Sequence, residues 1–552
     1  MNQVVGVSLS FAYLIAMIVI GVMVAKWNRT AEDYLVTGRE ANVLMIAAGA
    51  AAFQLAGTTV SGYPADAYTF GWGAAWGAWG WCIANTIFLL LVVKFARRSG
   101  TYTSTEWLGA LFGPITRLVV AIGAILGLVF SGMGQFVGAG NILAGWTGWS
   151  YTTSTFIVGV STIIYMYTGG MWATMLTDAI QFFIAAGVIY IFLPIFLYSK
   201  FGGLEYLSKG PNPLPPQHLR FPIGAHKFSR WLFPSVFGLI WMNITFAVAN
   251  PYYWQRAVTG RTEARAFRGW IWAVLFVIPF GIVMPLSGMY MHAYLGKLDN
   301  PQLVFGKLLG VMPTWLAALI MMGVLAATQS TADANIMGAA TIIARDVVPR
   351  ITKTNEKSLF SIAQWSTLLI GILCMVLALG YKQGALYGLA LMSTFIGALL
   401  PVLILSFFWR GGTKEGALVG CGVGIIFGLY WGVFSKLWQT VAHPMFLTPL
   451  VSLVLFVLVS LISRLTGPWW TVRRKSVEVT ADRIRIKEVG EQGFAMEASE
   501  PAPIRDELFE HAKLFYMLSK PWVKIPAYEK WMLKVFRNKN IVRAYEPAEN
   551  LQ

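Results

Sequence analysis

Long apolar runs separated by short polar segments occupy most of the chain, from about residue 4 to residue 465. A transmembrane helix needs about 20 predominantly apolar residues, and the runs predict about thirteen such helices. Because the runs are continuous and do not alternate at every second residue, they predict an all-α polytopic membrane protein and not a transmembrane β-barrel. The predicted helices begin near Val4, Val43, Trp72, Ile115, Tyr151, Met171, Trp231, Trp270, Pro313, Leu359, Leu386, Gly416 and Met445.

The composition agrees with this pattern. Of the 552 residues, 57% are hydrophobic and 12% are charged, and the mean hydropathy is +0.61. Soluble proteins have about 25% charged residues, and a soluble domain could not bury so much apolar surface. Soluble enzymes, disordered chains and secreted disulfide scaffolds are therefore excluded. The formal net charge of +17 is typical of a membrane protein with basic cytoplasmic segments and does not indicate a nucleic-acid partner.

Basic residues are concentrated in alternate loops between the predicted helices, and the positive-inside rule assigns such loops to the cytoplasm. The sequence therefore predicts an integral protein of the inner or plasma membrane, with its N-terminus outside and its C-terminus in the cytoplasm. Residues 466–552 are charged and contain no spanning run, which predicts a cytoplasmic tail. The basic residues assigned to cytoplasmic loops are Lys26, Arg29, Arg39, Lys94, Arg97, Arg98, Arg117, Arg256, Arg261, Arg265, Arg268, Arg345, Arg350, Lys353, Lys357, Arg410 and Lys414.

Three acids, Asp66, Asp178 and Asp333, lie inside predicted helices, where ionisable residues are costly and usually functional. Asp333 belongs to a polar stretch in the ninth predicted helix. Hydroxyl and carboxylate oxygens are the hard ligands that an alkali cation needs. A helical conformation places on one face, at spacings of three and four residues, Ala327, Ser330, Thr331 and Ala334. This face is therefore a candidate cation site.

The second predicted helix is rich in small residues and contains Gly57, Gly62 and Pro64. These residues permit a break that frees backbone carbonyls, and a broken helix near the membrane midplane is typical of a transporter binding site. The alternative is a glycine-kinked packing helix with satisfied hydroxyls. The polar face of the ninth helix favours the transporter interpretation. No nucleophile–base pair and no glycine-rich phosphate loop with Lys is present, so the sequence predicts neither an enzyme nor an ATP-driven pump.

Four segments, in this order, resemble the sodium/solute symporter family, which includes sugar, proline and sialic acid transporters. The first runs from Gly100 to Leu108, and the second from Gly169 to Gln181. The third joins Gln255-Arg256 to Glu263-Ala264-Arg265, and the fourth runs from Ala326 to Asp333 and is followed by Arg345-Asp346. The resemblance covers roughly residues 5–465.

The resemblance implies a LeuT-type core of two inverted repeats with five helices each, formed by predicted helices 2–6 and 7–11. The chain then divides into a first transmembrane helix and cytoplasmic loop (1–41), the transport core (42–410), two additional transmembrane helices (411–465) and the tail (466–552).

The resemblance also implies a principal sodium site. Its ligands would be the backbone carbonyls of Ala52, Leu55 and Ala327 and the hydroxyls of Ser330 and Thr331. Some family members bind a second sodium near the aspartate that corresponds to Asp178. This chain has Asp333 and Ala334 where that site uses serines, so Asp333 could be a second sodium ligand, a proton site or a buried packing residue.

The solute pocket should lie between predicted helices two, three, four, seven and eleven. Proline-type relatives have an Asp where this chain has Gln54, which argues against a proline-like solute. Each polar residue of this region could instead be a packing residue. The candidates for solute contact are Gln54, Thr58, Thr59, Ser131, Gln135, Asn243 and Thr245.

These observations predict a secondary active transporter that uses sodium as its coupling ion and imports a small organic solute, without an obligatory protein partner. Two alternatives remain. A proton-coupled carrier would keep the same fold and use Asp178 or Asp333. A transport-inactive membrane sensor would signal through the C-terminal tail, although the tail shows no signalling module.

Overall fold

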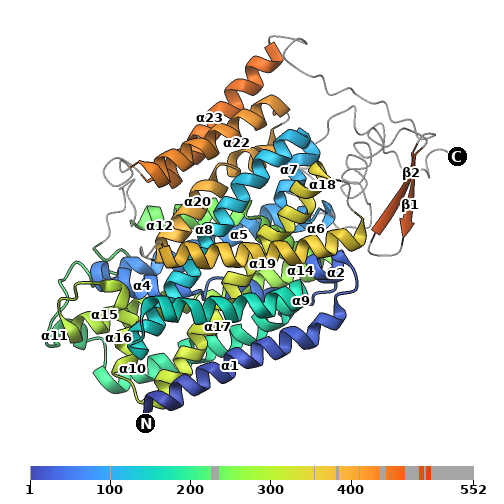
Figure 1. Cartoon of the computed structure of the whole chain (residues 1–552). Helices are drawn as coiled ribbons and strands as arrows, with labels where there is room; N and C mark the ends of the chain where they lie inside the picture. Colours follow the sequence, from blue (N-terminus) through green and yellow to red (C-terminus); the bar gives the residue numbers. More distant parts are fainter. Residues whose placement is uncertain are drawn as a thin grey trace.

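The computed structural model describes residues 2–99, 101–225, 235–352, 355–380, 385–409, 411–435, 443–465, 484–489 and 493–498, which are mostly helical (Figure 1). The first half forms α1 (Asn2–Val24), η1 (Ala25–Trp27), α2 (Ala31–Val36), η2 (Thr37–Arg39), α3 (Val43–Ala52), α4 (Gly57–Phe70), η3 (Gly71–Ala74), α5 (Ala75–Phe88), η4 (Leu89–Val93), α6 (Lys94–Ser99), α7 (Ser104–Phe112), α8 (Pro114–Thr147), α9 (Tyr151–Gly187), η5 (Val188–Phe192), α10 (Leu193–Phe201) and α11 (Tyr206–Lys209).

The second half forms α12 (Val236–Ala249), α13 (Pro251–Val258), α14 (Glu263–Val277), α15 (Phe280–Leu295), η6 (Pro301–Leu303), α16 (Val304–Gly310), α17 (Thr314–Ile342), η7 (Ile343–Val347), α18 (Val348–Ile351), α19 (Glu356–Gly380), α20 (Ala385–Gly397), α21 (Leu400–Phe408), α22 (Lys414–Leu429), η8 (Tyr430–Phe434) and α23 (Pro444–Leu465). Within the predicted tail, the described residues form an antiparallel hairpin of β1 (Ile484–Val489) and β2 (Gly493–Ala498). The remainder of the tail lies outside the described residues.

Eight helical stretches of the described residues are long and apolar enough to cross a membrane, or nine if the bent pair α20–α21 counts as one span. The predicted number of thirteen is therefore not confirmed. One reason is that a single stretch of 51 residues, Tyr151–Phe201, includes two of the predicted helices. Another is that α3 and α12 have only 10 and 14 residues, because each belongs to a broken helix.

The first break separates α3 from α4. Ala56, the last residue before α4, has an extended backbone with φ −95° and ψ 159°. Its amide donates to the Thr59 hydroxyl at 2.9 Å, and that hydroxyl donates to the Gln54 carbonyl at 2.5 Å. Inside a membrane a helix can break only where nearby groups satisfy the freed backbone. The side chain of Thr59 does so here.

The second break separates α12 from α13 at Asn250. Pro251 follows it and disfavours a helical conformation at the preceding residue; accordingly, Asn250 has φ −65° and ψ 119°. The Asn250 side chain accepts a hydrogen bond from the Tyr252 amide at 2.9 Å and so caps α13. The sequence thus contains the cause of both breaks.

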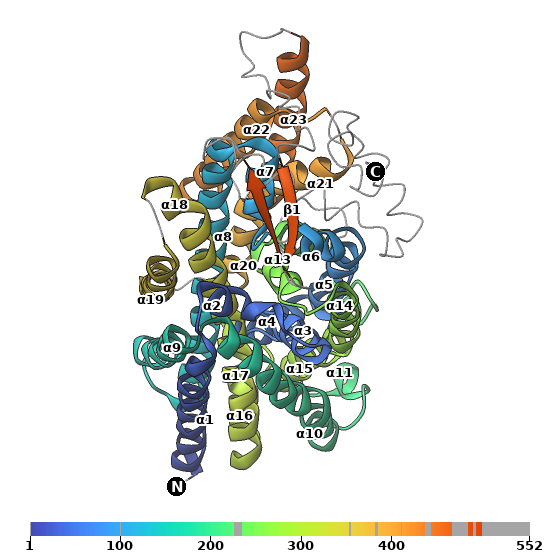
Figure 2. The ribbon, with the colours of Figure 1, turned by 90° about the vertical axis from the view of Figure 1, so that its right-hand side faces the viewer.

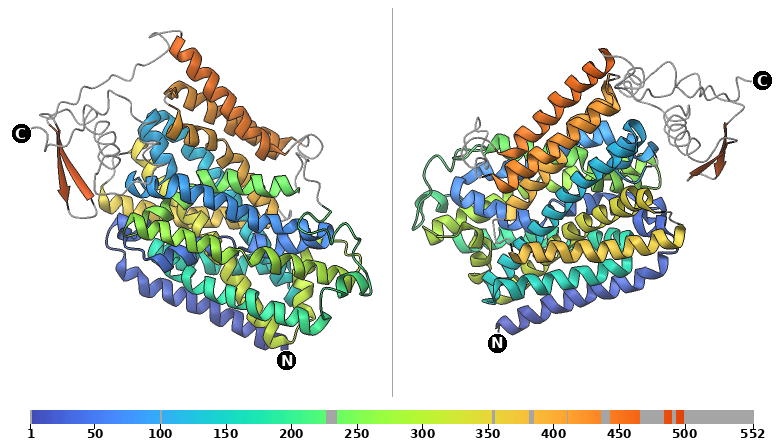
Figure 3. Two further views of the ribbon diagram at one scale, coloured as in Figure 1. Left: turned by 180° about the vertical axis from the view of Figure 1, so that it is seen from behind. Right: turned by 45° about the horizontal axis from the view of Figure 1, so that its top comes forward.

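The central helix is α17, which is buried along almost its whole length and packs against α1, α8, α9 and α19. On opposite sides of the molecule lie α1 and the pair α22–α23 (Figures 1 and 3). One end of the molecule carries α11, α15 and α16, and the other carries α2, α7 and α18 (Figure 1). Figure 2 shows α3 and α4 near the middle, where they contact α17.

Helix α9 bends sharply at Gly170, which has φ 54° and ψ −150°. The Tyr34 ring packs against this glycine, and a Cβ added there would lie 2.4 Å from Tyr34 Cδ2. Only glycine adopts such a backbone without strain. The bend therefore depends on this residue.

We expect Gly170→Ala to destabilise the protein by about 1–3 kcal/mol, because it combines a strained backbone conformation with a steric clash. The melting temperature of the detergent-purified protein measures this effect. Gly187→Ala is the matched control, since Gly187 ends the same helix and a Cβ there meets nothing within 4 Å. An unchanged melting temperature for Gly170→Ala would contradict the prediction.

Candidate functional site

The α3–α4 break lies against the polar stretch of α17. The Ser330 hydroxyl donates to the carbonyls of Ala327 at 2.9 Å and Ala52 at 3.5 Å. The Thr331 hydroxyl donates to the carbonyls of Ala327 at 3.2 Å and Phe53 at 3.3 Å. Four of the five predicted sodium ligands therefore converge at one buried point, where the two helices meet.

Leu55, the fifth predicted ligand, lies in the same break and is fully buried. The hydrogen bonds of the described residues connect the α17 hydroxyls to the carbonyls of Ala52 and Phe53 rather than to Leu55. Phe53 was not predicted as a site residue. The apolar side chain of Phe53 gave no signal of this contact, because its contribution comes from the backbone of the break.

The chemistry of these groups suits a hard monovalent cation. All of them are oxygens without a net charge, and they are shielded from solvent. For calcium, whose oxygen ligands lie at about 2.3–2.6 Å, two ligands at right angles are roughly 3.3–3.7 Å apart. The separations of 2.9–3.5 Å between the α17 hydroxyls and the carbonyls come near this range. Binding of a cation here would require the hydroxyl protons to turn away from the carbonyls.

Helix α8 contacts the α4 side of the same break through Gln135. The Gln135 side-chain oxygen accepts from the Thr58 amide at 3.2 Å, and its nitrogen donates to the Thr58 hydroxyl at 3.2 Å. Ser131 lies one turn before Gln135 on the same face of α8. Its buried hydroxyl has no hydrogen-bond partner among the described residues. Thr58 and Gln135 are thus two predicted solute residues that meet at the break, and Ser131 lies one helical turn from Gln135.

The other predicted solute residues have hydrogen bonds of a structural kind. Gln54 donates to the Tyr63 hydroxyl at 2.8 Å. The Thr59 hydroxyl accepts from the amide of Ala56 and donates to the carbonyl of Gln54 within the break. Asn243 donates to the carbonyl of Gly77 at 3.0 Å and so links α12 to α5. Thr245 donates to carbonyls within α12. These contacts show how each side chain is held and do not bring the four residues together.

Asp178 and Asp333 are both fully buried but have different partners. Asp178 in α9 forms an ion pair with Arg256 of α13. Asp333 in α17 accepts a hydrogen bond from the Tyr165 hydroxyl at 2.6 Å. The assignment of Arg256 to a cytoplasmic loop was wrong, because its side chain is fully buried within a helix. The available signal was its position directly after Gln255, in one of the segments that carry the family resemblance.

A network of charges connects α7, α8 and η7 at the end of the molecule that the sequence assigns to the cytoplasm. Arg117 pairs with Glu106 at 3.1 Å and with Asp346 at 2.6 Å. Arg345 pairs with Glu106 at 3.3 Å. Arg117 and Arg345, predicted as loop cations, therefore take part in tertiary structure.

Tyr102 lies beside this network. Its ring centre is 4.3 Å from the Arg345 guanidinium and 5.5 Å from that of Arg39. Burial raises the pKa of the Tyr102 hydroxyl, although both guanidiniums act in the opposite direction. The ring is therefore neutral at physiological pH, and its face attracts the two cations.

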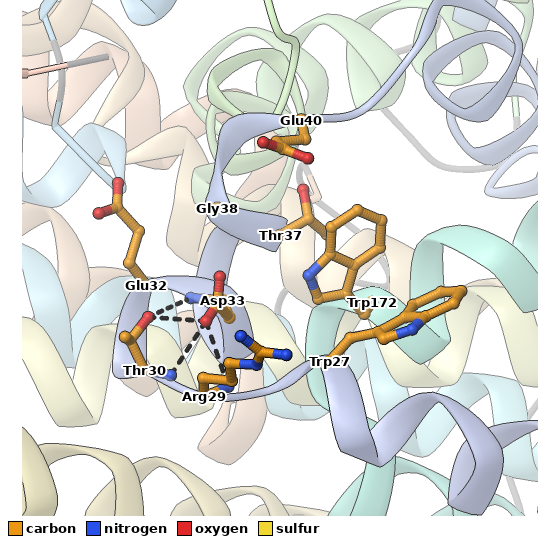
Figure 4. Close-up of a pocket in the computed structure, with 9 residues that line it drawn as sticks. All are labelled: Trp27, Arg29, Thr30, Glu32, Asp33, Thr37, Gly38, Glu40 and Trp172. Carbon is orange, nitrogen blue, oxygen red and sulfur yellow. Dashed lines mark hydrogen bonds between the residues drawn. The ribbon is translucent and has the colours of Figure 1, made fainter. Parts of the chain in front are cut away.

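A cavity of about 360 Å³ lies at the same end (Figure 4). Its two tryptophan rings meet edge to face with centroids 5.4 Å apart. Its acids have local structural roles, since Asp33 caps α2 through Thr30 and Glu32 pairs with Arg39 at 2.8 Å. None of the predicted site residues belongs to it. It is lined by Trp27, Arg29, Thr30, Glu32, Asp33, Thr37, Gly38, Glu40 and Trp172.

A sequence model of the sodium:solute symporter family matches residues 34–424. The chain belongs to the sodium:solute symporter family. This confirms the resemblance seen in the sequence and identifies the protein as an integral membrane transporter that uses sodium as its coupling ion.

Individual relatives agree with this assignment. The high-affinity proline transporter PutP of Bacillus subtilis is 26% identical over 441 residues, which cover 75% of this chain and 89% of the relative. The human sodium/iodide cotransporter is 24% identical over 453 residues, covering 76% and 68% respectively.

The fold comparison gives the same architecture. A Na⁺-coupled sialic acid symporter, solved in a substrate-bound outward-open state, matches with a TM-score of 0.70 and 19% identity. The match covers 83% of this chain and 98% of the symporter. The predicted all-α membrane fold with a LeuT-type core is therefore confirmed.

We expect Gly138→Ala to weaken sodium binding about tenfold, which corresponds to about 1.4 kcal/mol. A Cβ at Gly138 would lie 2.6 Å from the Gly57 carbonyl and 3.1 Å from the Thr58 amide, so it would displace the break. Sodium titration of the melting temperature measures binding. Gly145→Ala in the same helix is the control, because its nearest neighbour would be 3.6 Å away. Equal sodium affinities in the two variants would refute the prediction.

Proposed function

We propose that the protein is a symporter that imports a small organic solute together with sodium by alternating access. The observation that supports this most directly is the convergence of the Ser330 and Thr331 hydroxyls on carbonyls of a broken helix. Hydroxyls and freed carbonyls at a helix break are the groups with which transporters of this architecture bind their ions.

In this proposal the sodium ligands are Ala52, Leu55, Ala327, Ser330 and Thr331. They belong to two separate elements, the α3–α4 break and α17. A cation bound to both elements favours the arrangement in which they are close together. Because the solute candidates Thr58 and Gln135 lie on the other side of the same break, sodium occupancy would change the affinity for solute, and solute would change that for sodium to the same extent.

The driving force follows from the membrane potential and the sodium gradient. One positive charge that moves inward gains about 2.3 kcal/mol per 100 mV. Movement of the core helices against their neighbours would expose the site to each side in turn. We take the N-terminus to be outside and the C-terminus in the cytoplasm. In this orientation the charge network of α7, α8 and η7 closes the transport pathway toward the cytoplasm.

The proposed solute site comprises Gln54, Thr58, Thr59, Ser131, Gln135, Asn243 and Thr245. We give most weight to Thr58, Ser131 and Gln135, since they share one region and the Ser131 hydroxyl has no partner among the described residues. None of the seven is charged. Relatives are named for proline, a zwitterion, and for iodide, an anion, so the family alone does not define the solute. Asp178 and Asp333 remain candidates for a second sodium or a proton.

We expect Ser330→Ala and Thr331→Ala each to raise the sodium concentration for half-maximal uptake about ten- to a hundredfold. Each variant removes one hydroxyl oxygen that would contact the sodium ion. Loss of such a contact with a charged group costs about 1.5–3 kcal/mol of binding free energy. Uptake is measured in proteoliposomes with a solute found by screening sugars, amino acids, carboxylates and vitamins with and without sodium.

Ser287→Ala is the matched control for these variants. Ser287 is also fully buried, and its hydroxyl donates to the Met284 carbonyl within α15. Unchanged sodium dependence in both Ser330→Ala and Thr331→Ala would refute the proposed sodium site. Solute uptake that does not require sodium would refute the symporter itself.

We expect Gln54→Ala to raise the concentration of a neutral solute for half-maximal uptake by the equivalent of about 1–3 kcal/mol. The reason is that polar groups of the solute or pocket lose the side chain of Gln54 as their hydrogen-bond partner. Gln54→Asp should impair an anionic solute and spare a zwitterion or cation, since a charge in a low-dielectric pocket acts strongly. Tyr63→Phe provides the comparison, because it removes the hydroxyl that Gln54 binds. If Tyr63→Phe changes uptake as much as Gln54→Ala, Gln54 is a packing residue.

A further inference from the structure

The ion pair between Asp178 and Arg256 connects three elements of the core. Asp178 lies in α9 beyond its bend, and Arg256 lies in α13, which follows the second break. The guanidinium also packs against α3, because a Cβ added at Gly49 would lie 1.5 Å from Arg256 Nη1. The cation is therefore enclosed between the two broken helices and α9.

Other contacts hold the guanidinium in the same place. Its central carbon lies 4.7 Å from the centre of the Tyr252 ring, so the charge is stabilised by an aromatic face as well as by a carboxylate. Its Nε and Nη1 have no hydrogen-bond partner among the described residues. The Asp178 carboxylate is thus the principal hydrogen-bonding partner of a cation that has no exposed surface.

The charges around this pair do not balance. Asp178 and Asp333 carry two negative charges when ionised, and Arg256 carries one positive charge; all three side chains are fully buried. A buried charge needs a close partner of opposite sign. Asp178 pairs directly with Arg256, whereas Asp333 accepts a hydrogen bond from the Tyr165 hydroxyl and forms no ion pair with the described residues. A sodium ion at Asp178 would lie beside a second, immovable positive charge.

We propose that Arg256 is a fixed cation that takes the place of a transported second ion at Asp178, so that Asp178 is not a sodium ligand. The inference deepens the proposed function, because it limits any second sodium to Asp333. It also means that the positive charge next to Asp178 remains with α13 and is not released with the solute.

The test is the number of radioactive sodium ions bound per protein at saturation, measured on the purified full chain. The double variant Asp178→Asn/Arg256→Gln removes both charges and keeps a polar amide at each position. It should bind the same number of ions as the wild type, with half-saturation within about twofold. Loss of one bound sodium in the double variant would overturn the proposal.

The single variant Arg256→Gln tests whether Asp178 binds a sodium ion once its guanidinium partner is removed. It leaves the Asp178 carboxylate without its guanidinium, so it should bind one sodium more than the double variant. Equal numbers in the two variants would overturn the role of Arg256 as the substitute for an ion. If Arg256→Gln does not fold, as judged by size-exclusion chromatography, the double variant still decides the proposal.

Two further variants separate this inference from the proposed function. Ser330→Ala should lower sodium binding through the principal site, whatever the role of Arg256. Asp333→Asn should remove one bound sodium if Asp333 holds a second ion. A normal response to sodium in Ser330→Ala would refute the principal site and leave the comparison between wild type and double variant unaffected.

Discussion

The architecture depends on the need to satisfy backbone polar groups at two helix breaks inside a membrane, where water cannot do so. At the first break, Thr59 and Gln135 provide partners for the freed backbone groups. At the second, the Asn250 side chain caps α13, and the Ser104 hydroxyl donates to the Ala249 carbonyl at 3.0 Å. The helices that supply these side chains must lie beside the breaks, which fixes α7 and α8 around α3, α4 and α13.

The same requirement explains how a structural contact can also be a binding site. The hydroxyls of Ser330 and Thr331 satisfy carbonyls of the first break by donating protons to them. If each hydroxyl rotates, carbonyl and hydroxyl oxygens can face a cation together. The exchange would replace hydrogen bonds of 2.9–3.5 Å, both to the break and to the Ala327 carbonyl, by ion–oxygen contacts. The oxygen atoms that would face the cation are therefore already close together before it binds.

The sequence predicted those parts of the molecule whose cause is local. Apolar runs located the helices, Gly57 lies at the break predicted for the second helix, and the spacing of Ser330 and Thr331 predicted a shared polar face. The number of spans was not confirmed, because a window of constant length does not distinguish a bend such as Gly170 from a helix end. The placement of Arg256 was wrong because the positive-inside rule counts charges and ignores a buried carboxylate from a distant segment. The contact between Gln54 and Tyr63 depends on the course of the chain through the break, which the residue types do not reveal.

Tyr102 offers a different kind of contact from the ion pairs next to it. Arg39, in the connector before α3, and Arg345, in η7, both approach its neutral ring. Both arginines also pair with carboxylates, Arg345 with Glu106 at 3.3 Å and Arg39 with Glu32 at 2.8 Å. The Tyr102 ring therefore connects two ion pairs from distant segments without adding a charge, and a variant without the ring would leave the connector before α3 and η7 without this shared contact.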